Sequence, residues 1–235
     1  MLPREKSVVG ILTLGYLLAV ATSLRLLRPA PLALATAAYL LHLFTFDAIF
    51  YARSGSRFYL LAAVNFLPYL AAAVLGWWNA TAYVVGLVLF AAYAALLHLG
   101  RGRAVEGVVV GTALLASIFL LVKAIIMQQL EFRDYLLYLL FVGYHVATAY
   151  YVESRLAFRD VRPHTALYIW TPVAAFAVFL WPYLLIAVAE PFYKFLINVR
   201  SNVKCSRHED IVKMGWRELA RASLFTVVLA VVYYL

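Results

Sequence analysis

The chain has 235 residues, of which 66% are hydrophobic and 13% are charged, and its formal net charge is +9 at pH 7. A soluble domain averages about 45–50% apolar and about 25% charged residues, so this composition excludes a soluble globular protein and predicts a polytopic membrane protein. The lone cysteine, Cys205, excludes an internal disulfide, and the excess of lysine and arginine indicates basic loops beside anionic lipid rather than nucleic-acid binding.

Apolar stretches of roughly bilayer-spanning length, about 20 residues, follow one another along the chain. We expect transmembrane helices at 7–27, 32–52, 58–78, 80–99, 104–127, 135–151 and 219–235, with one or two more within 164–199. The predicted fold is an all-α helical bundle forming a single transmembrane domain over residues 1–235. Glutamine is confined to Gln128 and Gln129, which favours a thermophilic source.

The stretch 164–199 is too long for one ordinary span and barely long enough for two. One helix kinked at Trp181-Pro182 predicts eight spans, whereas two short helices turning there predict nine. With nine spans, fifteen of the twenty lysines and arginines fall in loops on the N-terminal side and three on the other side. The positive-inside rule therefore favours nine spans in the cell membrane with a cytoplasmic N-terminus.

Two stretches share the pattern His-x-x-Thr followed by aromatic and charged residues, one beginning at His42 and the other at His145. Each lies in a predicted span that ends in an arginine-bearing loop, and a proline-bearing span follows it. An internal four-helix repeat would place a site between the second and sixth spans. Chance similarity between apolar helices is the alternative explanation.

An ionisable side chain inside a span costs about 2.5–3.5 kcal/mol on insertion scales, so such residues are functional candidates by default. Arginines at the two helix ends would hold an anionic group, and carboxylates would orient them or bind metal; ion pairs that seal the helix ends are the structural alternative. The predicted ligand-binding residues are His42, Asp47, Tyr51, Arg53, Arg57, His145, Glu153, Arg155, Arg159 and Arg162.

Three other ionisable residues have simpler predicted roles. Lys123, near one end of its span, is expected to extend to the membrane interface. Glu190 and Lys194 are four residues apart, a spacing that predicts an ion pair on one helix face. The polar stretch 200–221 predicts either a solvated loop or an amphipathic helix among lipid headgroups.

Other chemistries have weaker signals. His42 and His145 would be a b-type haem ligand pair only if they faced each other at matching depth, which makes haem the minor alternative. The chain has no zinc-binding spacing and no glycine-rich phosphate loop.

Two resemblances bear on the function. The segment Tyr151-Val152-Glu153-Ser154-Arg155-Leu156 and the closing Lys213-x-Gly215-Trp216-Arg217-Glu218-Leu219 resemble the YwiC-like membrane proteins, a family that implies no particular activity. Its opening motif is matched only by Pro3-Arg4-Glu5-Lys6, without the usual His and Gly.

The nine-span plan is also similar to UbiA-type prenyltransferases. That resemblance implies magnesium and a prenyl diphosphate, but the aspartate-rich motifs that hold them are missing here.

The sequence thus predicts an inside-facing site for an anionic lipid or a prenyl phosphate, with membrane lipids as partners. The alternative is a transporter or accessory membrane subunit without catalysis.

Overall fold

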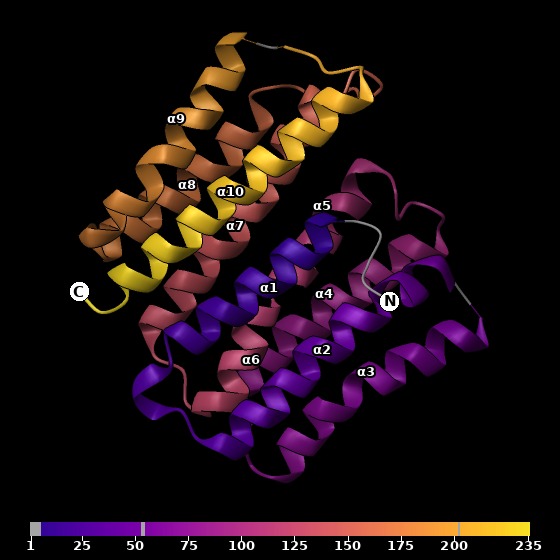
Figure 1. Ribbon diagram of the computed structural model, residues 1–235, viewed down its shortest axis with the longest axis vertical. Helices are drawn as coiled ribbons and strands as arrows, with labels where there is room; N and C mark the ends of the chain where they lie inside the picture. The colour runs from indigo at the N-terminus through magenta and orange to yellow at the C-terminus, as the bar shows by residue number, and fades with distance from the viewer. Residues whose placement is uncertain (1–5, 53–54, 202) are drawn as a thin grey trace. The chain divides into compact units, whose positions relative to one another are not determined.

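The computed structural model describes residues 6–52, 55–201 and 203–235, except the side chains of residues 6, 47 and 50–52. Within these residues the regular structure is helical, apart from one isolated β-bridge between Leu156 and Cys205. The chain divides into two compact units, residues 1–135 and 136–235 (Figure 1). The all-α prediction is confirmed, while the single transmembrane domain stays a prediction.

The first unit contains six α-helices where five spans were predicted, because the span expected at 104–127 is divided into two helices at Ser117. They are α1 (Lys6–Ala21), α2 (Pro29–Ala52), α3 (Ser56–Val74), α4 (Ala80–His98), α5 (Val105–Ala116) and α6 (Ile118–Met127), with a short 3-10 turn at Leu24–Leu26. Gly76 and Gly100 end α3 and α4 with φ values of 73° and 71°, a left-handed conformation that glycine adopts without strain. Ser117 separates α5 from α6, where its hydroxyl donates to the carbonyl of Leu114.

Polar side chains join neighbouring helices of the first unit. The Thr13 hydroxyl lies 2.8 Å from that of Tyr39, and these two residues join α1 to α2. Thr45 donates to Asn65 across α2 and α3 at 3.0 Å. Between apolar helices there is little hydrophobic driving force in lipid, so such hydrogen bonds and close packing hold the helices together.

The second unit consists of most of α7 (Phe132–Arg155), which begins in the first unit, together with α8 (Thr165–Leu180), α9 (Leu185–Ser201) and α10 (His208–Val232). Trp181 leaves the helical conformation with φ −145° and ψ 90°, and a 3-10 turn follows at Pro182–Leu184. The proline ring disfavours helical backbone at the preceding residue, which explains the break. The stretch 164–199 is therefore two short helices, as one of the two alternatives predicted.

The last helix is longer than predicted, because it begins at His208 rather than near residue 219. Most of the polar stretch 200–221 is thus the first half of α10 and not a loop. Glu209 and Asp210 lie in the first turn of α10, where negative charge is favourable to the helix dipole.

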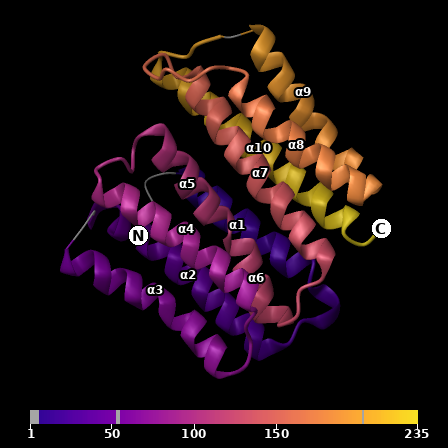
Figure 2. The same cartoon turned by 180° about the vertical axis from the view of Figure 1, so that it is seen from behind.

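An aromatic cluster forms the core of the second unit. Tyr144 of α7 stacks on Phe225 of α10 with ring centroids 4.2 Å apart, and it contacts the edge of Trp170 of α8 at 6.1 Å. Trp170 also contacts Phe195 of α9 at 6.2 Å. Because one residue from each helix takes part, the cluster fixes the four helices around one centre; the views from both sides show them side by side (Figure 2).

Gly143→Ala is expected to destabilise this unit by about 1–3 kcal/mol, the usual cost of overpacking. A Cβ at this position of α7 would lie 2.7 Å from Cγ1 of Val173 on α8, and the β-branched valine has little freedom to move. Unfolding in detergent monitored by circular dichroism measures the effect. The Gly143→Ala, Val173→Ala double variant should recover part of the loss; an equal loss in both variants would contradict the close approach of α7 and α8.

Five helices in the described part of the chain are long and apolar enough to cross a membrane. They lie at Pro29–Phe46, Ser56–Val74, Ala80–His98, Val105–Met127 (α5 and α6 taken together) and Phe132–Arg155, and shorter apolar helices occur at Ser7–Ala21 and Thr165–Leu180. These lengths and compositions indicate a membrane protein.

Candidate functional site

A buried lysine lies at the centre of the polar residues in the second unit. The ammonium of Lys194, which is 4% exposed, donates to Glu218 Oε2 at 2.9 Å and to Thr148 Oγ1 at 3.0 Å. It also lies 4.4 Å from the ring centroid of Phe195 and 4.6 Å from that of Tyr144. The carboxylate and the aromatic faces together compensate for the desolvation of the cation.

Glu218 connects this lysine to an arginine. Arg221, one turn further along α10, donates from Nη1 to Glu218 Oε1 at 2.9 Å, and its Nε lies 3.3 Å from Glu190 Oε1 on α9. The spacing-based prediction that Glu190 pairs with Lys194 is therefore wrong. Lys194 turns inward to Glu218, while Glu190 stays on the exposed edge of α9 and pairs across the helices with Arg221.

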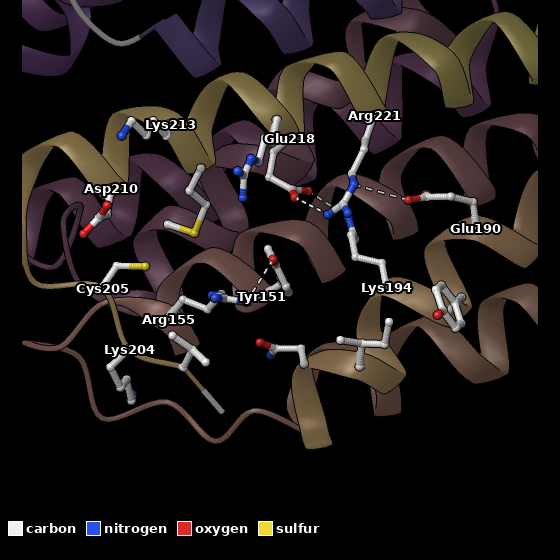
Figure 3. A pocket seen from close by; sticks show the side chains of 16 residues that line it. Tyr151, Arg155, Glu190, Lys194, Lys204, Cys205, Asp210, Lys213, Glu218 and Arg221 are labelled. Atoms are coloured by element: carbon white, nitrogen blue, oxygen red, sulfur yellow. Dashed lines mark hydrogen bonds and ion pairs between the residues drawn. The ribbon is translucent and has the colours of Figure 1, made fainter. Parts of the chain in front are cut away.

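A pocket of about 600 Å³ lies beside these ion pairs (Figure 3). Its lining comes from the end of α7, from α9, from α10 and from the segment 203–205. Six lining residues are basic and three are acidic. The basic ones are Arg155, Lys194, Lys204, Lys213, Arg217 and Arg221, and the acidic ones are Glu190, Asp210 and Glu218.

Two backbone hydrogen bonds fix the wall of the pocket that lies between α9 and α10. Cys205 donates its N–H to the carbonyl of Arg155 at 2.6 Å and accepts from the N–H of Ala157 at 3.1 Å. Through this β-bridge the segment preceding α10 is held against the C-terminal end of α7. Lys204, beside the bridge, donates to the carbonyl of Arg159 at 3.3 Å.

Four of the six cations have no carboxylate partner among the described residues, namely Arg155, Lys204, Lys213 and Arg217. Arg155 is held by its own helix, since its Nη1 donates to the hydroxyl of Tyr151 at 3.4 Å and its guanidinium carbon lies 5.6 Å from that ring centroid. The pocket therefore combines a neutralised set of ion pairs at one end with uncompensated positive charge elsewhere, an arrangement suited to an anion.

Of the predicted site residues in the second unit, Arg155 is the one that lines this pocket. Glu153 is buried and pairs with Arg159 at 2.8 Å, so these two residues form an ion pair at the helix end. His145 is 5% exposed and packs against the edge of Phe141. Arg162 is exposed.

The predicted residues of the first unit have other surroundings. His42 shares a 2.6 Å hydrogen bond with the hydroxyl of Tyr69, so this ring nitrogen already has a protein partner. Arg57 is exposed in the first turn of α3. Arg53 and the side chains of Asp47 and Tyr51 lie outside the described residues.

The prediction that Lys123 extends to the membrane interface is also wrong. Instead of extending to the interface, its side chain is 0% exposed and lies 2.6 Å from Asp134, which is also 0% exposed. It donates to the hydroxyl of Thr22 at 2.8 Å as well. The carboxylate of Asp134 also accepts the N–H of Glu131, so the start of α7 is joined to α6 and to the end of α1 within the first unit.

The basic residues that the sequence analysis left out had a detectable signal. Lys213, Arg217 and Arg221 recur every four residues, which places them along one face of a helix. Treating 200–221 as a loop or an interfacial helix hid this face, because the stripe becomes visible only when α10 is taken as one helix from His208.

The described residues contain no cluster of three or more histidine, cysteine, aspartate or glutamate side chains that could hold a metal ion. No known protein-family model matches the chain, and no curated protein and no solved structure is significantly similar to it.

Proposed function

We propose that the protein is an integral membrane protein that binds the anionic head of an amphipathic lipid in the pocket of its second unit. The observation that supports this most directly is the set of four cations without a carboxylate partner among the described residues of the pocket wall. Arginine can grip a phosphate oxygen pair with two parallel hydrogen bonds, and lysine adds a point charge. Phosphate-type heads therefore suit the pocket best.

The length of α10 supports the same proposal. Its 25 residues extend about 38 Å, whereas the hydrocarbon core of a bilayer is about 30 Å thick. The charged residues of α10 lie between Glu209 and Arg221, and the remaining residues up to Val232 carry no charge. When this uncharged C-terminal part lies in the hydrocarbon, the charged part and the pocket beside it lie towards one surface of the membrane.

We further propose that the helices cross the cell membrane nine times, with α5 and α6 together forming one crossing and the N-terminus in the cytoplasm. The break at Trp181 supplies the turn that nine crossings require. The loop between α7 and α8 and the loop between α9 and α10 then lie on the cytoplasmic side, where the positive-inside rule places basic residues. The lipid pocket would open on that side, as in the arrangement predicted from the sequence.

The proposed binding of the lipid phosphate differs from the magnesium-dependent binding that a resemblance to UbiA-type enzymes implies. The aspartate-rich motifs are missing from the sequence, so the proposed site relies on arginine and lysine side chains to neutralise the phosphate. Lipid binding is proposed without a reaction, and membership of the YwiC-like proteins stays a prediction.

The test replaces two pocket arginines in the full chain, as Arg155→Gln with Arg217→Gln. We expect phosphatidylglycerol to bind about tenfold more weakly for each arginine lost, because a hydrogen bond to a charged group contributes about 1.5–3 kcal/mol. Native mass spectrometry of the protein released from micelles measures the retained lipid, with phosphatidylcholine, a zwitterionic lipid of zero net charge, as the comparison.

The matched control is the Arg57→Gln, Arg162→Gln variant, which loses the same charge from two exposed arginines outside the pocket. Its phosphatidylglycerol retention should equal that of the unaltered protein. Equal retention in all three proteins would contradict the proposed site, and weaker retention in the control alone would shift the site to the residues first predicted from the sequence.

A further inference from the structure

The pocket has two edges of different chemistry. On α9, Tyr193 and Ile197 line the pocket and are also 64% and 41% exposed at the protein surface. On α10, the facing edge carries the exposed Lys213 and Arg217 together with the exposed Asp210. The α9 edge is therefore apolar beyond Glu190 and the α10 edge has a net positive charge, while the buried residues Lys194, Asn198, Met214 and Glu218 also line the pocket.

Helices α9 and α10 are joined by ion pairs at one end of this opening and are separated at the other end. The ion pairs Glu190–Arg221 and Lys194–Glu218 connect α9 to α10 on the side of the helix break. Towards the segment 203–205 the helices diverge, as both views of the ribbon show (Figure 1, Figure 2). The pocket lies in the part where α9 and α10 diverge. Its opening, between the two edges, therefore faces sideways between the two helices.

We infer that the ligand enters this pocket sideways from the bilayer, between α9 and α10, and that its hydrocarbon chain remains against Tyr193 and Ile197 while its phosphate contacts Arg217 and Arg155. The inference rests on the proposed function, to which it adds the source and the orientation of the ligand. A free phosphate has the same head chemistry but nothing to place against the apolar edge.

A further exposed apolar side chain lies on this face of α9 outside the pocket. Ile186 lies two turns before Tyr193 on the same face of α9 and is 65% exposed. Exposed apolar side chains on a membrane helix contact lipid chains, so an acyl chain can lie against Tyr193 and Ile197, whereas Glu190 separates this part of the face from Ile186. The basic edge opposite then receives the head at the point where the chain meets the pocket.

The experiment compares two ligands with the same head, phosphatidylglycerol and its deacylated form glycerophosphoglycerol, on the unaltered protein and on Ile197→Trp. The larger side chain narrows the opening without changing any charge. We expect phosphatidylglycerol to bind about tenfold more weakly to Ile197→Trp, a loss of about 1.4 kcal/mol, and the affinity for glycerophosphoglycerol to stay within about twofold. Ile186→Trp, outside the pocket on the same exposed face, should behave like the unaltered protein.

Unchanged phosphatidylglycerol affinity in Ile197→Trp, with the lipid still bound, would overturn side entry alone. An equal loss for both ligands would also overturn it, because the substitution would then act on the head. If the unaltered protein binds neither ligand, the proposed function fails and this inference fails with it. Equal affinity of the unaltered protein for both ligands would show that the chain contributes nothing, and would overturn the inference in favour of a soluble anion.

Discussion

Asp134→Leu should destabilise the protein by about 3–5 kcal/mol, the usual cost of leaving one partner of a buried ion pair without the other. Lys123 and Asp134 are both fully buried, and the hydroxyl and carbonyl of Thr22, to which the Lys123 ammonium also donates, carry no negative charge to replace the carboxylate. A charge in the low-dielectric interior of a helical membrane unit has no water to replace the lost partner. Reversible unfolding by denaturing detergent, followed by circular dichroism, measures the loss.

The Lys123→Met, Asp134→Leu double variant is the control for this experiment. Removing both charges leaves no uncompensated cation, so the double variant should be much more stable than Asp134→Leu alone. A double variant as unstable as the single one would show that the side-chain volumes, and not the charge, determine the effect. The coupling between the two positions can then be read directly from the double-mutant cycle.

Glu218→Leu should likewise destabilise the second unit by about 3 kcal/mol, because it leaves the buried Lys194 without a carboxylate partner. The adjacent Arg221 would worsen the effect, since it would lose one of its two carboxylates and remain close to an unneutralised lysine. Thermal unfolding in mixed micelles provides the measurement, and Lys194→Met in the same chain should restore most of the lost stability.

The Glu190→Leu variant distinguishes the observed ion pair, Glu190 with Arg221, from the pair that sequence spacing predicts, Glu190 with Lys194. Glu190 is 43% exposed on its side chain, and its partner Arg221 also contacts Glu218, so its loss should cost about 1 kcal/mol or less. If Lys194 instead depended on Glu190, the two substitutions would exchange their effects. A larger loss from Glu190→Leu than from Glu218→Leu would contradict the arrangement of ion pairs.

The helical segments were predictable because apolar length and strong local signals coincide. Pro29 begins α2, glycines follow the ends of α3 and α4, and Pro182 breaks the stretch that was too long for one helix. The start of α10 was not predictable in the same way. Residues 208–217 mix charged residues with Ile211, Val212, Met214 and Trp216, so a search for continuous apolar stretches does not detect the first part of this helix.

The site was less predictable than the helices. Ionisable residues inside the predicted spans were the right kind of residue, but the sequence did not show with which residues they form ion pairs. Lys194 and Glu190 were recognised as candidates, yet Glu218 is 24 residues beyond Lys194 and comes close to it only when α9 and α10 pack together. Sequence spacing along one helix cannot report a partner on another helix. Arg155 was found because it ends a helix, and the end of α7 is one wall of the pocket.

The β-bridge at the pocket wall has a practical consequence. It holds Cys205, the one thiol of the whole chain, at a partly exposed position on the pocket surface. A fluorophore or spin label attached there would report occupancy of the pocket in the natural sequence, with no other sulfhydryl to remove first. Ligand titrations could then be followed by emission or line shape in intact proteoliposomes.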